Sequence, residues 1–233
     1  MEELSIAQRI AVWVLPILFA ITVHEVAHGW MALQLGDRTA QMMGRLTLNP
    51  IHHIDPVGTL LIPGISLLLG GVIFGWAKPV PVSWGRLRRP KRDMAIVALA
   101  GPIANLMMAI LWGFISRLGI ILAPDLTVIG IPLFYMGIAG IFINVILMML
   151  NLIPLPPLDG GRVLVGLLPE SIASKVSYIE PFGLIILLLL LFSGALWYLL
   201  WPLVNLLLAG LVHFAGIPKQ DFIRALLALM GAQ

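Results

Sequence analysis

The segment from residue 6 to residue 35 is almost wholly apolar, yet it carries two histidines and a glutamate. A bilayer offers the backbone no water, so such a segment crosses as a helix whose hydrogen bonds are all internal, and about 20 residues suffice. His24 and His28 are four positions apart, so a helix places both on one face, where they can bind one cation. Because ionisable groups at membrane depth are costly, we expect this cluster to be functional.

Glu25 follows the first histidine and completes a His-Glu-x-x-His motif. This motif places two metal-binding imidazoles on one helix face, beside a carboxylate that can reach a metal-bound water. A catalytic zinc ion needs a third protein ligand, which leaves its fourth position open for water. The motif therefore predicts a catalytic Zn²⁺ site in a membrane helix, with a third ligand elsewhere in the chain.

The rest of the chain has the composition of an integral membrane protein. Of its 233 residues, 60% are hydrophobic and 11% are charged, whereas soluble domains carry about 25% charged residues. The chain has no cysteine, which excludes disulfides and thiolate ligands. Six basic residues cluster between positions 78 and 92. We interpret this cluster as a cytoplasmic loop beside the membrane rather than a surface for nucleic acid.

Five apolar segments are candidates for membrane helices: 6–34, 57–75, 94–118, 128–153 and 181–216. The last could hold two short spans with a break near Ser193-Gly194 or Trp201-Pro202, or one span and an interfacial segment. We expect an all-α polytopic membrane protein of about five to six transmembrane helices. It would form one domain over residues 1–216, with a catalytic core at about 6–165 and a short amphipathic tail at 217–233.

Segment 57–75 is a special case because basic loops flank it on both sides and because it contains helix-breaking residues. Loops 36–56 and 76–93 both carry basic residues, which favours the cytoplasmic side for both. The two loops would lie on opposite sides if 57–75 crossed the membrane. The segment contains Pro63-Gly64 and Gly70-Gly71, which weaken helices. We therefore predict a re-entrant segment that returns to the same face, with an ordinary kinked span as the alternative.

One acidic residue stands out as a candidate third ligand. Asp159 follows an apolar span and three prolines, and it precedes two glycines. The prolines end the helix and expose backbone groups, and the glycines allow another backbone to approach closely. Such a break suits a carboxylate at the edge of a cavity. A ligand at Glu170 or Glu180 would instead indicate a different class of zinc membrane protease.

Three motifs in this order resemble those of the site-2 proteases, which are intramembrane zinc metalloproteases. They are His-Glu-x-x-His at 24–28, Ala-Gly-Pro-x-x-Asn at 100–105 and Asn-x-x-Pro-x-Pro-x-Leu-Asp-Gly at 151–160. The resemblance implies that His24, His28 and Asp159 bind Zn²⁺ and that Glu25 is the catalytic acid/base. It also implies single-pass transmembrane proteins as substrates. The chain lacks the PDZ-like and nucleotide-sensing domains of larger members, so we expect a minimal core form.

The resemblance agrees with the orientation that the charges predict. Residues 6 and 24 are separated by about 27 Å of helix, so an N-terminus outside the cell places His24 near the cytoplasmic leaflet. In the family the active site also lies toward the cytoplasmic side. The short polar loops fit the plasma membrane of a bacterium or archaeon.

A substrate helix must unwind before cleavage, and an unwound strand in lipid needs backbone partners. Residues 71–82 predict a short β-like edge near the active site, which a substrate strand could join. Val80 and Val82 are therefore candidates for substrate contact, with a surface loop as the alternative. Asn151 could bind substrate or an oxyanion, with capping of the helix end as the alternative. Asn105 is a weaker candidate, because packing or an interhelical hydrogen bond explains it better.

Two other functions agree with a metal site in the membrane. A transporter or channel could use the same buried groups, but no inverted repeat is evident and polar residues do not recur along several spans. A pseudo-protease could bind the metal without cleaving, but the glutamate and all the proposed ligands are present. An intramembrane zinc endopeptidase is therefore the favoured interpretation.

Overall fold

The computed structural model describes residues 4–61 and 77–231, and within these ranges it contains helices and no strand. The helices are α1 (Ile6–Gln34), α2 (Thr39–Met42), η1 (Pro50–His53), η2 (Pro56–Leu61), η3 (Trp84–Arg86), α4 (Pro90–Leu122), α5 (Thr127–Asn151), α6 (Asp159–Leu167), α7 (Glu170–Ser177), α8 (Glu180–Phe192), α9 (Ala195–Phe214) and α10 (Lys219–Met230). The prediction of an all-α protein is confirmed.

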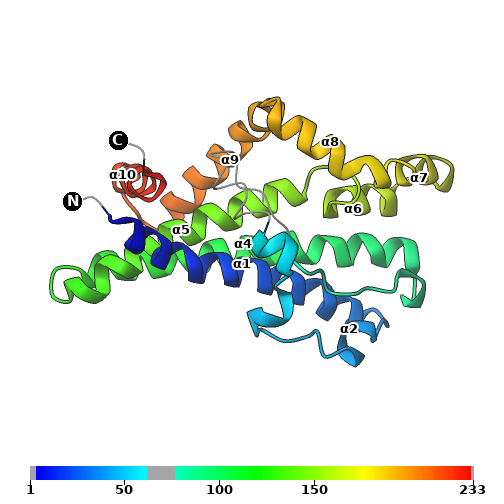
Figure 1. The fold of residues 1–233 in the computed structure, drawn as a ribbon, viewed down its shortest axis with the longest axis horizontal. Helices are drawn as coiled ribbons and strands as arrows, with labels where there is room; N and C mark the ends of the chain where they lie inside the picture. The colour runs from blue at the N-terminus through cyan, green and yellow to red at the C-terminus, as the bar shows by residue number, and fades with distance from the viewer. Residues whose placement is uncertain (1–3, 62–76, 232–233) are drawn as a thin grey trace.

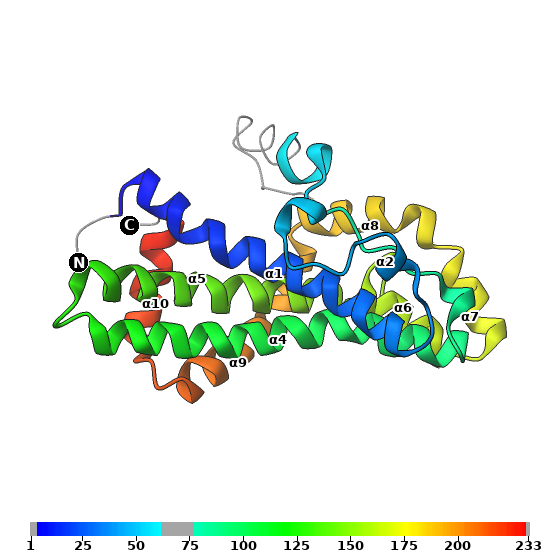
Figure 2. The same ribbon diagram turned by 90° about the horizontal axis from the view of Figure 1, so that it is seen from below.

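Helices α1, α4 and α5 form the centre of the molecule and run side by side along its long axis (Figures 1 and 2). Ile138, Ile141 and Val145 of α5 are fully buried between its neighbours. Helices α4 and α5 approach closely because small residues face each other. A Cβ at Gly137 would lie only 2.5 Å from Ser116 Cα, and such small-residue contacts are how membrane helices gain packing energy.

Among the described residues, four helices are long and apolar enough to cross a membrane: α1, α4, α5 and α9. A fifth crossing is present if α7 and α8, which meet at a 62° bend, count as one broken span. Most of segment 57–75 lies outside the described residues, as do residues 71–76 of the expected β-like edge. Residues 77–83 are described, and they form no strand.

The stretch 181–216 contains the break that the sequence predicts near Ser193-Gly194. Helix α8 ends at Phe192 and α9 begins at Ala195, with the left-handed Gly194 (φ 76°) between them. The tail forms the amphipathic helix α10, which packs against α5 and α9. It buries Phe222, Ala225 and Leu229, whose spacing places them on one helix face.

The two loops that flank residues 62–76 are in contact with each other. The Lys78 amide donates to the His53 carbonyl at 2.9 Å, and the Arg45 guanidinium donates to the Lys78 carbonyl at 3.0 Å. His53 and Lys78, on either side of this part of the chain, are therefore adjacent. Whether 57–75 re-enters the membrane stays a prediction.

Asp37 joins the end of α1 to the loop before η3. Its carboxylate accepts the Thr39 amide at 3.0 Å and the Ser83 amide at 2.6 Å, and it also accepts the Thr39 hydroxyl. Burial raises the pKa of Asp37, but these hydrogen bonds outweigh burial and lower the pKa below its ordinary value near 3.8. The ionised carboxylate thus fixes Ser83, the last residue of the irregular stretch 77–83, against the end of α1.

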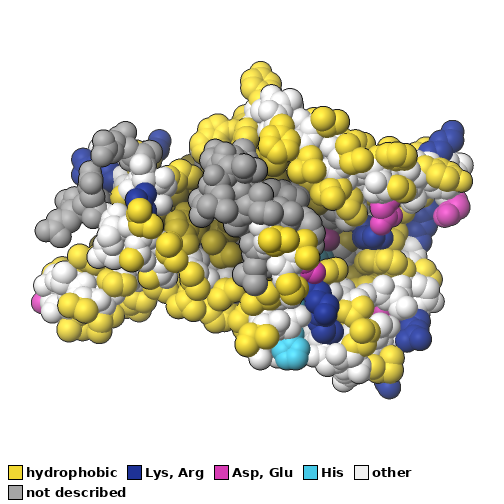
Figure 3. All heavy atoms as spheres, viewed as in Figure 1, with side chains coloured by type: hydrophobic (Ala, Val, Ile, Leu, Met, Phe, Trp, Pro, Cys, Tyr) yellow, Lys and Arg dark blue, Asp and Glu magenta, His cyan; other side chains and the backbone are white. Residues whose placement is uncertain are grey.

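Large hydrophobic side chains remain exposed on the outer faces of the helices. Figure 3 shows them over most of one face of the molecule. They include Ile10, Met107, Phe114, Leu189 and Leu206, all more than half exposed. In water so much apolar surface would be unfavourable, whereas lipid accommodates it, so these faces suit contact with the bilayer.

Candidate metal centre

Helices α1 and α4 pack against each other at the two histidines. On α4, Val97, Gly101 and Asn105 are spaced by four residues and therefore share one face. His24 lies opposite Asn105 and His28 lies opposite Val97. The two imidazoles extend across this face, and their Nε2 atoms are 3.0 Å apart.

Asp159 brings a carboxylate to the same point from a different part of the chain. Its Oδ2 lies 3.2 Å from His24 Nε2 and 3.3 Å from His28 Nε2. Helix α5 ends at Asn151, a proline-containing turn follows, and Asp159 is the first residue of α6. The close backbone approach predicted at the following glycines is present, because a Cβ at Gly160 would collide with the carbonyl group of Leu152.

Hydrogen bonds on the far side of each ring determine which imidazole nitrogen carries a proton. His24 Nδ1 lies 2.6 Å from Asn105 Oδ1, and His28 Nδ1 lies 2.8 Å from the Val97 carbonyl oxygen. Both oxygens can only accept, so in the neutral rings each Nδ1 donates and each Nε2 presents a lone pair. The three facing atoms of His24, His28 and Asp159 are then all acceptors.

Three acceptors that converge without a proton between them need a cation. Asp159 Oδ2 is buried and has no hydrogen-bond donor within the described residues, which is costly unless a positive charge is present. Ligands about 2.1 Å from a tetrahedral zinc ion are about 3.4 Å apart, close to the 3.0 to 3.3 Å observed. The donor set and its spacing therefore fit Zn²⁺.

A network of buried side-chain amides holds the Nδ1 side of His24. Asn105 donates from Nδ2 to the Ala20 carbonyl at 3.1 Å and to Asn144 Oδ1 at 2.9 Å, and Asn144 in turn donates to the Gly140 carbonyl. Both asparagines are fully buried. The interhelical role expected for Asn105 is thus present, and it joins α1, α4 and α5. Its tentative substrate role stays untested, and its hydrogen bonds all go to neighbouring helices and His24.

Asn144 was not among the residues singled out from the sequence. The sequence does contain a feature that predicts its role. Asn144 is a polar amide in an otherwise apolar span, and such residues commonly form interhelical hydrogen bonds. Its partner could not be read from the sequence, since 39 positions separate it from Asn105.

Glu25 is held by the backbone of the irregular stretch 77–83. Its Oε2 accepts the Val80 amide at 2.7 Å. Pro79 and Pro81 flank Val80 and have no N–H, so Val80 supplies the one backbone donor of this three-residue run. The Val80 side chain is buried against Gly29 of α1, and Val82 packs against the cluster of Ala32, Leu87 and Val97. Contact of Val80 and Val82 with substrate stays a prediction, and the Val80 amide is already engaged by Glu25.

Asn151 lies at the end of α5 and donates from Nδ2 to the Leu147 carbonyl at 3.0 Å. This bond corresponds to the capping role that we considered as the alternative for Asn151. The two glutamates that could have replaced Asp159 are engaged elsewhere. Glu170 pairs with Lys91 at 3.0 Å and Glu180 pairs with Arg162 at 2.6 Å.

Comparison with known proteins agrees with this chemistry. Residues 118–192 match peptidase family M50. The chain is 38% identical to the "Putative zinc metalloprotease YwhC" of Bacillus subtilis (strain 168), over 82% of this chain and 85% of that protein. It is 33% identical to the "Putative zinc metalloprotease Rip2" of Mycolicibacterium smegmatis, over 77% of this chain and 66% of that protein. No solved structure matches at a significant level.

The chain is similar to the Bacillus subtilis protein over most of its length, and it matches the family model. It also has candidate membrane helices and a His-His-Asp group that could hold a metal. Zn²⁺ is the metal that the family and the names of these relatives imply. The chain therefore belongs to peptidase family M50, the family of the site-2 proteases.

Proposed function

We propose that the chain is an intramembrane zinc endopeptidase that cleaves transmembrane segments of single-pass membrane proteins. One observation carries this proposal: two imidazoles and a carboxylate present three acceptor atoms to one point between apolar helices, with Glu25 next to the first ligand. In this proposal His24, His28 and Asp159 hold the zinc and Glu25 is the catalytic acid/base.

Zinc, when bound, supplies a Lewis acid that lowers the pKa of a water and polarises the carbonyl of the scissile bond. Glu25 then takes the proton of the attacking water and delivers it to the leaving amine. The Val80 amide anchors Oε2 of this carboxylate at 2.7 Å, which leaves Oε1 to carry the proton. The anchor restricts the rotation of Glu25 and so keeps its second oxygen in a defined position.

The position of the centre supports a substrate within the membrane. His24 and His28 lie in the second half of α1, a helix apolar enough to span. A peptide bond that reaches them must have left its own helical hydrogen bonds, and the freed groups need new partners. Val82 and Asn151 remain our candidates for such contacts. We also propose that the basic end of the bundle, which carries residues 78–92, faces the cytoplasm.

The proposal is tested by cleavage of a panel of single-pass transmembrane substrates by purified wild type and Glu25→Gln in detergent. Zinc content is measured in both proteins. Because the glutamine retains the shape of the side chain but cannot accept the proton, we expect equal zinc content and cleavage by wild type only. Equal cleavage by both proteins would refute the role of Glu25. Zinc in both without any cleavage of the panel would favour a binding-only protein or a transporter.

A second comparison tests the metal ligands themselves. Asp159→Ala removes a ligand, whereas Glu170→Ala removes an exposed carboxylate that pairs with Lys91. We expect zinc loss from the first variant and full zinc content in the second. The opposite result would assign the chain to a class of zinc protease with a glutamate ligand.

A further inference from the structure

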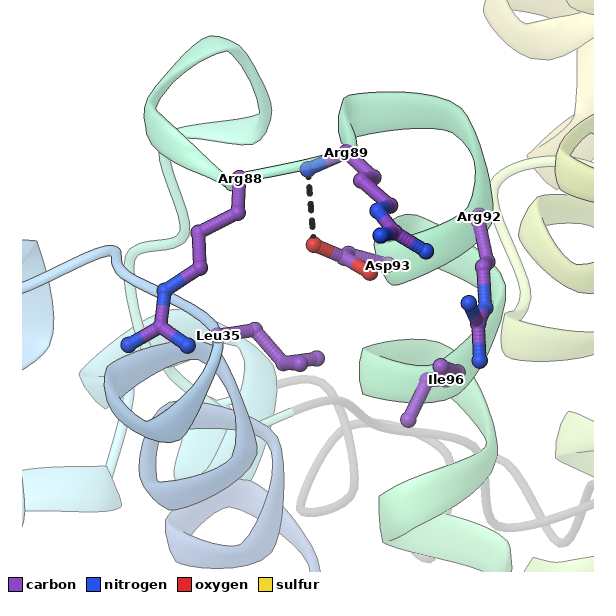
Figure 4. A pocket seen from close by; sticks show the side chains of 6 residues that line it. All are labelled: Leu35, Arg88, Arg89, Arg92, Asp93 and Ile96. Atoms are coloured by element: carbon purple, nitrogen blue, oxygen red, sulfur yellow. Dashed lines mark hydrogen bonds between the residues drawn. The ribbon is translucent and has the colours of Figure 1, made fainter.

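A cavity of about 240 Å³ lies between the end of α1 and the start of α4, away from the metal centre. It is lined by Leu35, Arg88, Arg89, Arg92, Asp93 and Ile96. Figure 4 shows Arg88 on one side and Arg92 on the other, both extending toward the apolar Leu35 and Ile96, with Arg89 between them. Three guanidinium groups from one short stretch of chain therefore surround a small cavity with an apolar wall.

The protein neutralises only part of the positive charge of this cavity. In the described part of the chain, none of the three arginines forms an ion pair or a side-chain hydrogen bond, and all three are exposed. Asp93, the acid in the lining, is buried and accepts the Arg89 amide at 2.8 Å. Its carboxylate thus caps the start of α4 and removes one charge of the three.

The cavity also lies where two candidate membrane spans end. Leu35 directly follows the last residue of the candidate span α1, and Arg89 directly precedes the first residue of the candidate span α4. The Arg88 amide donates to the Leu35 carbonyl at 3.0 Å, which holds the loop against the end of α1. Spans that cross the hydrocarbon core end near the lipid headgroups, so we expect the three guanidinium groups at the depth of the lipid phosphates and Leu35 and Ile96 nearer the acyl chains.

We propose that this cavity binds the phosphate of an anionic phospholipid headgroup. The planar guanidinium fork matches the geometry of phosphate oxygens, and basic sites between membrane helices recognise anionic headgroups. An apolar wall beside the arginines favours a phosphate that carries an acyl chain over a free phosphate ion. The site touches neither the proposed zinc ligands nor Glu25, so it does not depend on the proposed catalytic function.

The test is titration of phosphatidylglycerol into the purified full chain in neutral detergent micelles, with binding followed by native mass spectrometry. The pocket variant is Arg89→Gln/Arg92→Gln. The matched control is Arg38→Gln/Lys175→Gln, which removes two exposed cations outside the cavity, one at the start of α2 and one in α7. Since each basic residue near an anionic surface is worth about fivefold in affinity, we expect about tenfold weaker binding or more by the pocket variant. The control should change affinity by less than about twofold.

Equal weakening by both variants would show that diffuse surface charge binds the lipid, and it would overturn the pocket. Equal binding of phosphatidylcholine would overturn selectivity for an anionic headgroup. Displacement of the lipid by excess inorganic phosphate would show a site for the free anion and overturn the lipid assignment. Arg89→Lys/Arg92→Lys, which retains both charges, should bind better than the glutamine variant. Unchanged zinc content and thermal melting in all variants show that a loss of binding is not a loss of fold.

Discussion

Gly101→Ala is the single substitution that most directly tests the packing of α1 on α4 at the metal centre. A Cβ at position 101 would lie 2.5 Å from His24 Cε1 and 2.6 Å from His28 Cε1. Real carbon–carbon contacts are about 3.5 to 4.0 Å. The rings cannot move away freely, because Asn105 holds His24 and Val97 holds His28 on the same face of α4. The added methyl group must therefore displace either the imidazoles or the two helices.

The magnitude follows from two opposing effects. Alanine is favoured over glycine within a helix by about 0.5–1 kcal/mol. Overpacking of a well-filled site costs about 1–3 kcal/mol, and here the cost is concentrated on the proposed ligands. If that cost appears in metal binding, zinc affinity falls by about 5- to 150-fold. In the metal-free protein the rings can turn aside by giving up their hydrogen bonds to Asn105 and Val97, so its stability should change less.

Zinc affinity is measured by competition with a chromophoric chelator, and stability by thermal melting of the metal-free protein. The matched control is Gly210→Ala in α9, where a Cβ would meet no atom within 4 Å, so it should leave zinc affinity unchanged. Zinc affinity of Gly101→Ala within about twofold of wild type would refute the reasoning. The centre would then tolerate a displacement that the observed contacts forbid.

Three further predictions concern groups around the centre. Asn105→Leu removes the acceptor of His24 Nδ1, so zinc affinity in the chelator competition should fall by about 10- to 100-fold, and an unchanged affinity would contradict the supporting role of the amide. Val80→Pro removes the amide that anchors Glu25, so cleavage should slow by about 10- to 100-fold at normal zinc content; normal cleavage would show that the anchor is dispensable. Because the pKa of Asp37 is lowered in the folded state, its contribution to stability is present above its ordinary value near 3.8 and is lost as the pH falls through the lowered pKa. The melting temperature of Asp37→Asn should therefore lie below that of wild type at neutral pH, and the two temperatures should converge in acid. A difference in melting temperature that does not change with pH would refute this.

Local features of the sequence were sufficient to predict the three central membrane helices and part of the metal centre. The apolar runs predict α1, α4 and α5, because twenty consecutive apolar residues have few stable alternatives to a membrane helix. His24 and His28 share a face by helical periodicity alone. Ser193-Gly194 predicts the break between α8 and α9, since glycine adopts the left-handed conformation found there. The number of membrane spans could not be predicted from the sequence in the same way. Helices α7 and α8 meet at a bend, and whether they form one span depends on how they pack.

The amino-acid sequence by itself thus determined that the chain is helical, lies in a membrane and carries a pair of imidazoles beside a carboxylate on one helix. Only the tertiary structure decided what surrounds them. It placed Asp159 Oδ2 against both rings, brought Asn144 to Asn105, and put the Val80 amide on Glu25. These contacts join residues far apart in the chain, and their distances are set by how closely the helices pack, which no local periodicity encodes.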